Sequence, residues 1–167
     1  MMKQAIAPAS AAGWQFWMGW MPAFLGFPLG GVVAAALVGP ITTPLAGALG
    51  GVLAGAVVGT AQWLVLRRRL PLSFWWIAAT ALGMAAGLAL GILLLGTGSE
   101  GAALPLRGLI TGASIGVAQS LLLRKLSSRA PAWALIVALG WALGWVITRA
   151  VGVDLALNWA VFGSSGA

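Results

Sequence analysis

Long apolar runs separated by short polar or basic segments make up most of this chain. A run of about 20 apolar residues is long enough for a helix to cross the ~30 Å hydrocarbon core of a bilayer. Proline and glycine mark the turns between runs, as in the segments 39–44 and 96–101. Pro22 and Pro28 lie inside the first run and should kink it. The predicted spans are 14–38, 45–66, 74–95, 105–123 and 132–151.

The two ends of the chain break this pattern. Residues 1–13 predict a small, flexible lead before a single membrane domain over 14–167. The apolar segment 155–167 is too short to cross a bilayer as a helix, so it predicts a truncated sixth span. Either the natural chain ends in this half-helix or it continues past Ala167. The second interpretation is favoured, because a helix that ends in lipid leaves carbonyls unsatisfied.

An internal repeat with a period of 57 residues underlies the pattern of spans. The segment 55–67 aligns without a gap on 112–124, with eight of thirteen residues identical. A fixed period of this length indicates repeated copies of one supersecondary unit. The predicted fold is therefore an all-α integral membrane protein built from tandem transmembrane helical hairpins, with five full spans plus a truncated sixth. The expected units are two hairpins over 14–66 and 74–123 and an incomplete third unit over 131–167.

Glycines recur three or four residues apart along the predicted helices, which places them on one face. Lipid tails are as apolar as leucine, so burial alone cannot drive helices together in a membrane, whereas close backbone approach at small residues can. These faces therefore predict seams between helices. The expected helix-packing residues are Gly51, Gly55, Gly59, Gly83, Gly87, Gly108, Gly112, Gly116, Gly140 and Gly144.

Two amides, Gln62 and Gln119, occupy the same position of successive repeats and lie on the glycine faces. An amide that faces another helix favours an interhelical hydrogen bond. The functional alternative is that Gln62 and Gln119 line a polar path, ligate a magnesium porphyrin or bind a lipid headgroup. A pigment, a carotenoid or a lipid is therefore the cofactor class that the chain could hold, and no particular cofactor is identified.

Tryptophan is abundant, with ten residues. Those near the ends of the spans predict an aromatic belt at the level of the headgroups. Trp141 and Trp145 lie deeper and four residues apart, which places them on one helix face. That face suits a partner helix, a carotenoid or a quinone, and it is the docking surface that we expect. The residues assigned to the belt are Trp14, Trp17, Trp20, Trp63, Trp75, Trp76, Trp133 and Trp159.

The net charge of +7 would suggest a nucleic-acid partner in a soluble protein. Here the basic residues lie in short loops between spans, so the charge predicts topology and no nucleic acid. Seven basic residues fall on one side of an alternating arrangement and two on the other, which predicts a multi-pass membrane protein with a cytoplasmic N-terminus. The residues expected to attract anionic lipid headgroups are Arg67, Arg68, Arg69, Arg124 and Lys125.

Catalytic chemistry has few residues to work with. The chain has no histidine, no cysteine and no tyrosine, and Glu100 and Asp154 are its only acids. Thiolate or imidazole metal sites lack their ligands, and a nucleophile lacks an activating partner. We therefore expect no enzyme and no metal centre. The two acids lie near the outer arginines, which predicts the interfacial ion pairs Glu100 with Arg107 and Arg149 with Asp154.

The repeated motif Gly-Ala-x-x-Gly-x-x-Gln-(Trp)-Leu-x-Leu-Arg, followed by tryptophan and Leu-Gly-x-x-x-Gly, resembles a group of small bacterial membrane proteins built from the same tandem hairpin. The resemblance covers about 47–145 and implies the architecture without a reaction. The expected function is a non-enzymatic accessory or scaffold subunit that packs by its glycine faces against other subunits of a photosynthetic or respiratory complex. The alternative is a small channel or transporter with Gln62 and Gln119 lining its path.

Overall fold

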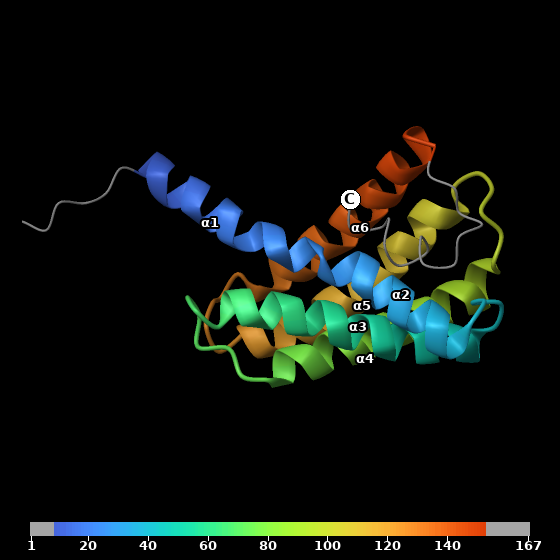
Figure 1. The fold of residues 1–167 in the computed structure, drawn as a ribbon, viewed down its shortest axis with the longest axis horizontal. Helices are drawn as coiled ribbons and strands as arrows, with labels where there is room; N and C mark the ends of the chain where they lie inside the picture. The colour runs from blue at the N-terminus through green and yellow to red at the C-terminus, as the bar shows by residue number, and fades with distance from the viewer. Residues whose placement is uncertain (1–8, 153–167) are drawn as a thin grey trace, which may run out of the picture.

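The computed structural model describes residues 9–152, which form α-helices joined by short loops (Figure 1). Five helical segments, counting Met18–Val38 as one, are long and apolar enough to cross a membrane. The chain is therefore an all-α, multi-pass membrane protein. The expected truncated sixth span lies outside the described residues. The helices are α1 (Ala9–Phe24), α2 (Gly26–Val38), α3 (Pro44–Leu66), α4 (Trp75–Leu95), α5 (Ala103–Leu123) and α6 (Ala130–Ala150).

The first span bends once, between α1 and α2. Pro22 lies inside α1 and has no N–H to donate to the preceding turn. The Leu25 N–H instead reaches the Pro22 carbonyl at 3.2 Å, which tightens the chain at the junction. Pro28 lies in the first turn of α2, where a missing donor costs nothing. The first span is therefore bent at one place, although it contains two prolines. The helix α1 begins at Ala9, so the last residues of the predicted flexible lead are helical.

The loops at the other helix ends follow from local chemistry. Gly39 and Gly96 end α2 and α4 with φ of 78° and 68°, which glycine adopts without the steric cost of a Cβ. Thr43 caps α3, because its Oγ1 accepts from Ala46 N at 3.1 Å while Pro44 occupies the first helical position. The two loops that carry most of the basic residues, 67–74 and 124–129, lie at the same end of the bundle, which we call the basic end (Figure 1).

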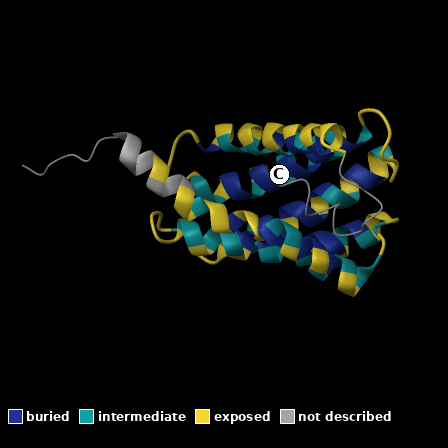
Figure 2. Cartoon of the chain, turned by 45° about the horizontal axis from the view of Figure 1, so that its top comes forward, coloured by how far each residue is buried: buried dark blue, intermediate teal, exposed yellow. Residues whose placement is uncertain are grey.

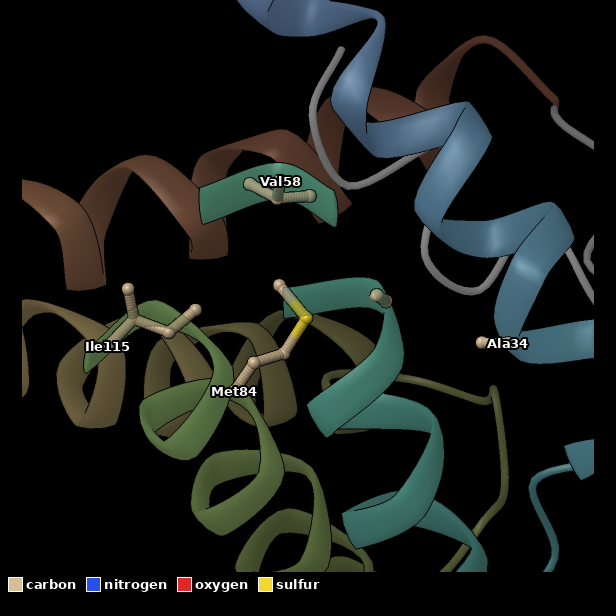
Figure 3. Close-up of a cluster of buried hydrophobic side chains, with 5 residues drawn as sticks. Ala34, Val58, Met84 and Ile115 are labelled. Carbon is tan, nitrogen blue, oxygen red and sulfur yellow. The ribbon is translucent and has the colours of Figure 1, made fainter. Parts of the chain in front are cut away.

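The helices pack in chain order. The most extensive interfaces join α3 to α4 and α5 to α6, followed by α4 to α5 and α2 to α3. Buried residues line the interior and exposed residues face outward along every helix (Figure 2). Met84 of α4 lies in the core near Val58 and Ile115 (Figure 3), and the outer surface is rich in exposed leucine, valine and isoleucine. The core therefore lies between helices whose lipid-facing sides are just as apolar.

One kind of seam joins α4 to α5 and α2 to α3, in each case at a pair of glycines on the earlier helix. A Cβ added to Gly83 would lie 2.6 Å from the Ile115 Cα, and one added to Gly87 would lie 2.5 Å from the Thr111 Cα. Both distances are too short for any side chain, so glycine is needed there for the close approach of α4 and α5. The same contacts recur one period earlier between α2 and α3. The equivalent pairs are Gly26 with Val58 and Gly83 with Ile115, then Gly30 with Ala54 and Gly87 with Thr111.

A second kind of seam joins α3 to α4 and α5 to α6. Here the glycine lies on the earlier helix and meets the backbone of a small or branched residue on the later one. Hypothetical Cβ atoms on these glycines would lie 2.7 to 3.0 Å from the facing Cα. The equivalent pairs are Gly55 with Ala81 and Gly112 with Ala138, then Gly59 with Ile77 and Gly116 with Ala134. Gly51 packs in the same way on Ala85. The 57-residue repeat is therefore also a repeat of helix contacts.

Gly140 is the exception among the expected seam residues. It is exposed, and a Cβ added there would meet nothing within 4 Å. Gly140 is the repeat equivalent of Gly83, which packs on the following helix α5. No helix follows α6 within residues 9–152, so Gly140 has no such neighbour there. Gly144, one turn further along, is buried.

Candidate functional site

A buried cluster of hydrogen bonds surrounds Gln119, near the basic end of α5. Gln119 is 2% exposed. Its Nε2 donates to Thr80 Oγ1 at 2.9 Å and to Gln62 Oε1 at 3.4 Å, and its Oε1 accepts from Trp133 Nε1 at 2.8 Å. The side chain thus bonds to α3, α4 and α6 at once. Both hydrogens of the Gln119 amide and one lone pair of its oxygen are used.

The same pairing occurs in the preceding repeat. Gln62 Oε1 accepts from Trp76 Nε1 at 3.2 Å, and both glutamine–tryptophan pairs are separated by 14 residues. Gln62 and Gln119 are themselves 57 residues apart, which is one period. Each glutamine near the end of one helix therefore meets the indole N–H at the start of the next. We call this group the glutamine–tryptophan cluster: Gln62, Trp76, Thr80, Gln119 and Trp133.

Thr80 completes the cluster on its buried side. Its Oγ1 donates to the Trp76 carbonyl at 2.8 Å while it accepts from Gln119, so the hydroxyl is satisfied in both directions. The Trp76 and Trp133 rings lie next to each other, with centroids 6.4 Å apart. An unmet polar group would cost several kcal/mol in a dry interior. The cluster consists of amides, indoles and one hydroxyl, and its hydrogen bonds hold the helices together.

The sequence correctly placed Gln62 and Gln119 at a helix interface but missed their partners. Trp76 and Trp133 were assigned to the aromatic belt, yet Trp76 is 1% exposed and Trp133 is half-buried. Thr80 was not singled out, although its exposure is 0%. A usable signal was present, because Trp76 and Trp133 are also one period apart and keep the same 14-residue distance from their glutamines.

Trp141 and Trp145 do not form an outward docking surface. Trp145 is 5% exposed, and its Cδ1 lies where a Cβ on Gly108 would stand. Trp141 packs against the core, with its ring 5.9 Å from that of Phe27 and its Cβ beside Gly112. The expectation of an exposed ridge is therefore wrong. The physical reason is that Gly108 and Gly112 have no side chains, so α5 leaves room for the two indoles to pack against it inside the bundle.

The loops at the basic end are fastened to their helices. Trp63 Nε1 donates to the Leu72 carbonyl at 3.1 Å, and Ser120 Oγ, one period later, donates to the Ala130 carbonyl at 2.8 Å. The Arg67 guanidinium lies 4.5 Å from the centre of the Trp63 ring, which is within the range of a cation–π contact. The basic residues of these loops are exposed at the bundle end. They are Arg67, Arg68, Arg69, Arg124, Lys125 and Arg129.

Arg107 fastens the loop at the opposite end. Its guanidinium donates to the Gly96 carbonyl at 3.1 Å and also to the Gly98 carbonyl, so it holds the chain between α4 and α5. The expected pairing of Arg107 with Glu100 is replaced by these carbonyl contacts. The other expected pair involves Asp154, which lies outside the described residues. Arg107 Nε and Thr111 Oγ1 are buried without a hydrogen-bond partner in the described part of the chain.

Neither a search for metal-binding side chains nor comparison with known proteins adds a further site. Within residues 9–152, no group of three or more histidine, cysteine, aspartate or glutamate side chains could hold a metal ion. Comparison of the chain with protein-family models, with curated proteins and with solved structures found no match.

Proposed function

We propose that this protein is a non-enzymatic scaffold or accessory subunit of a larger assembly in the bacterial inner membrane, with its N-terminus in the cytoplasm. It would act by presenting a rigid, glycine-packed helix bundle to neighbouring membrane proteins. The orientation rests on the basic loops at one end of the bundle. A pigment, a carotenoid or a lipid is a compatible companion.

The observation that carries the proposal is the closure of the glutamine–tryptophan cluster. Ion and solute paths through membranes are usually marked by polar groups that face water or one another across a pore. Here both amide hydrogens of Gln119 are used by protein acceptors, and its oxygen is bonded to Trp133. A solute passing between the helices would have to break these bonds. The most prominent polar cluster of the membrane interior therefore supports a mechanical role for the bundle.

The remaining surface agrees with a role in the plane of the membrane. Large apolar side chains are exposed along the helices, including Leu37, Leu82 and Leu135. Such side chains face lipid or another membrane helix equally well, because both are apolar. Since Trp141 and Trp145 are committed to packing inside the bundle, a partner would contact the outer leucine-rich faces.

The experiment is a solute-flux assay paired with cross-linking in native membranes. We expect liposomes containing the purified protein to release potassium, protons and glycerol no faster than protein-free liposomes. Residue-specific cross-linkers placed at Leu37, Leu82 and Leu135 should each capture neighbouring membrane proteins, with one recurrent partner from at least one face. Gln119→Leu serves as the comparison, because it removes the central amide of the cluster. Flux through the wild type that Gln119→Leu changes, with no recurrent partner, would establish the channel instead.

A further inference from the structure

Helix α1 turns away from α3 (Figure 1). A groove lined by residues of the first span and of α3 lies between them. Its volume is about 510 Å³. Pro22 and Leu25 form one wall and Val57 and Leu64 of α3 form the other. The groove exists because the two helices touch at Gly26, where a Cβ would lie 3.1 Å from the Val58 Cα, and then separate beyond the bend at Leu25.

The lining of this groove is apolar throughout. Thr60 is its one hydroxyl-bearing residue, and its Oγ1 donates to the Ala56 carbonyl of its own helix at 2.7 Å. That bond leaves the threonine methyl group as its main contribution to the groove surface. Ala56 and Ala61 line the groove with short side chains, which leave its volume open. An occupant must therefore be a hydrocarbon, because the lining offers nothing to replace the hydration of a polar solute.

The groove points toward the basic end. Val57, Ala61 and Leu64 follow one another at spacings of four and three residues, so they share one face of α3, and Arg68 follows in the turn just after α3 ends at Leu66. From Ala56 to Leu64 the groove covers roughly 12 Å along the helix axis. Half of the hydrocarbon core of a bilayer is about 15 Å. The groove therefore covers most of the depth of one leaflet, and the basic turn 67–69 begins just beyond Leu64 in the chain.

We propose that this groove binds one anionic glycerophospholipid from the leaflet at the basic end. One acyl chain lies between the α1–α2 bend and α3, and the phosphate meets the Arg68 guanidinium. Arg68 is exposed and has no side-chain partner within residues 9–152, whereas the neighbouring Arg67 is held over Trp63. An apolar groove that covers most of one leaflet, followed in the chain by an exposed arginine in the turn after α3, matches the acyl chain and the phosphate of such a lipid.

The repeat supplies matched controls within the same chain. Lys125 is the equivalent of Arg68 one period later, and Ala113 is the equivalent of Ala56. The second unit lacks the proline that makes the groove, because Ala79 stands at the position of Pro22 and α4 runs unbroken from Trp75 to Leu95. A lipid attracted only by basic charge would respond to Lys125 as it does to Arg68. A lipid held in the groove would not.

The test uses the full chain in detergent, with phosphatidylglycerol or phosphatidylcholine added and retained lipid counted by native mass spectrometry. We expect one phosphatidylglycerol to be retained by the wild type, and Arg68→Gln to weaken its retention about fivefold, the ratio expected for loss of one basic residue near an anionic surface. Ala56→Phe should fill the groove and abolish retention. Lys125→Gln and Ala113→Phe should both behave as the wild type. Thermal melting of each variant shows that it is folded.

Residue-level evidence comes from phosphatidylglycerol with a photoactivatable group on its acyl chain. Cross-links should fall on the α3 segment 56–64 and on Leu25, and Ala56→Phe should remove them. Three results would overturn the proposal: equal loss from Arg68→Gln and Lys125→Gln, equal retention of phosphatidylcholine, or cross-links spread evenly over the helices. Loss of folding in Ala56→Phe would leave Arg68→Gln and the cross-link positions to decide, since neither depends on that variant.

Discussion

Gln119 donates a hydrogen bond to Gln62 across 3.4 Å, so the same position of two successive repeats meets itself. The bond joins α3 and α5, which are not direct neighbours in the packing order of the bundle. Helix α4 lies between them in the chain and contributes Thr80 and Trp76 to the same cluster. Trp133 of α6 bonds to the same glutamine, so the cluster ties four consecutive helices together near the basic loops.

Removal of the central amide should destabilise the bundle. Gln119→Leu leaves Trp133 without its acceptor and deletes two donors, and we expect the free energy of unfolding to fall by about 2 kcal/mol. Gln62→Leu should cost about half as much. Unfolding in mixed detergent micelles, followed by tryptophan fluorescence, measures both. A double-mutant cycle should return a coupling of about 0.6 kcal/mol for the amide pair. A coupling of zero would mean that the 3.4 Å contact contributes nothing.

Two glycines at equivalent repeat positions should respond in opposite ways to a larger side chain. Gly83→Leu places a Cβ against the Ile115 backbone, which cannot yield as a flexible side chain could, so α4 and α5 must separate. We expect the variant to lose most of its folded yield. Gly140→Leu, its control, enters open space and should melt like the wild type. The measurement is melting temperature and monodispersity in detergent, and equal damage from the two changes would contradict the seam geometry.

Trp145 should behave as a core residue. Its truncation to alanine removes a side chain that is 5% exposed and leaves a cavity beside Gly108, so we expect a loss of about 3–5 kcal/mol of folding free energy. Trp75, which is 58% exposed at the start of α4, provides the control. Trp75→Ala should change stability little. If Trp145→Ala were as mild as Trp75→Ala, the indole would not be packed as described.

The proposed orientation can be read directly because the chain has no cysteine. A single cysteine at Glu100, in the loop between α4 and α5, should react with an impermeant maleimide in intact cells. A single cysteine at Ser127, in the exposed loop between α5 and α6, should react only after lysis. The reverse pattern would invert the topology while leaving the fold unchanged.

Much of this architecture could be predicted from sequence because membrane spans are a matter of length and polarity. The predicted ends of three spans, Leu66, Leu95 and Leu123, agree with the structure, and their predicted starts differ from it by one or two residues. Glycine spacing identified the seams for the same reason, since only the smallest residue allows backbones to approach within contact distance. The location of the two glutamines at helix interfaces followed from the glycine faces on which they lie, whereas their bond to each other was not predicted. Each of these inferences used a residue type with few structural alternatives.

The orientation of the tryptophans could not be predicted in the same way. In a soluble helix, polar residues mark the outward face, but here lipid and protein interior are equally apolar, so no such mark exists. The 57-residue spacing of Trp76 and Trp133 is the one sequence signal that sets them apart. The buried Trp145 has no such signal to distinguish it from the exposed Trp75. The α1–α2 groove was missed for a related reason. The groove depends on the distance by which the proline bend separates α1 from α3, and this distance cannot be predicted from the sequence.

The matched seams also say how this fold could grow or shrink. At each junction between units, a glycine on the last helix of one unit packs against a small residue on the first helix of the next. The pairs are Gly55 with Ala81 and Gly112 with Ala138. Stability in such an array is close to a sum over adjacent modules. A gene that gained or lost one 57-residue module would keep complementary surfaces at every junction. The number of helices in the bundle could therefore change during evolution without the formation of a new kind of interface.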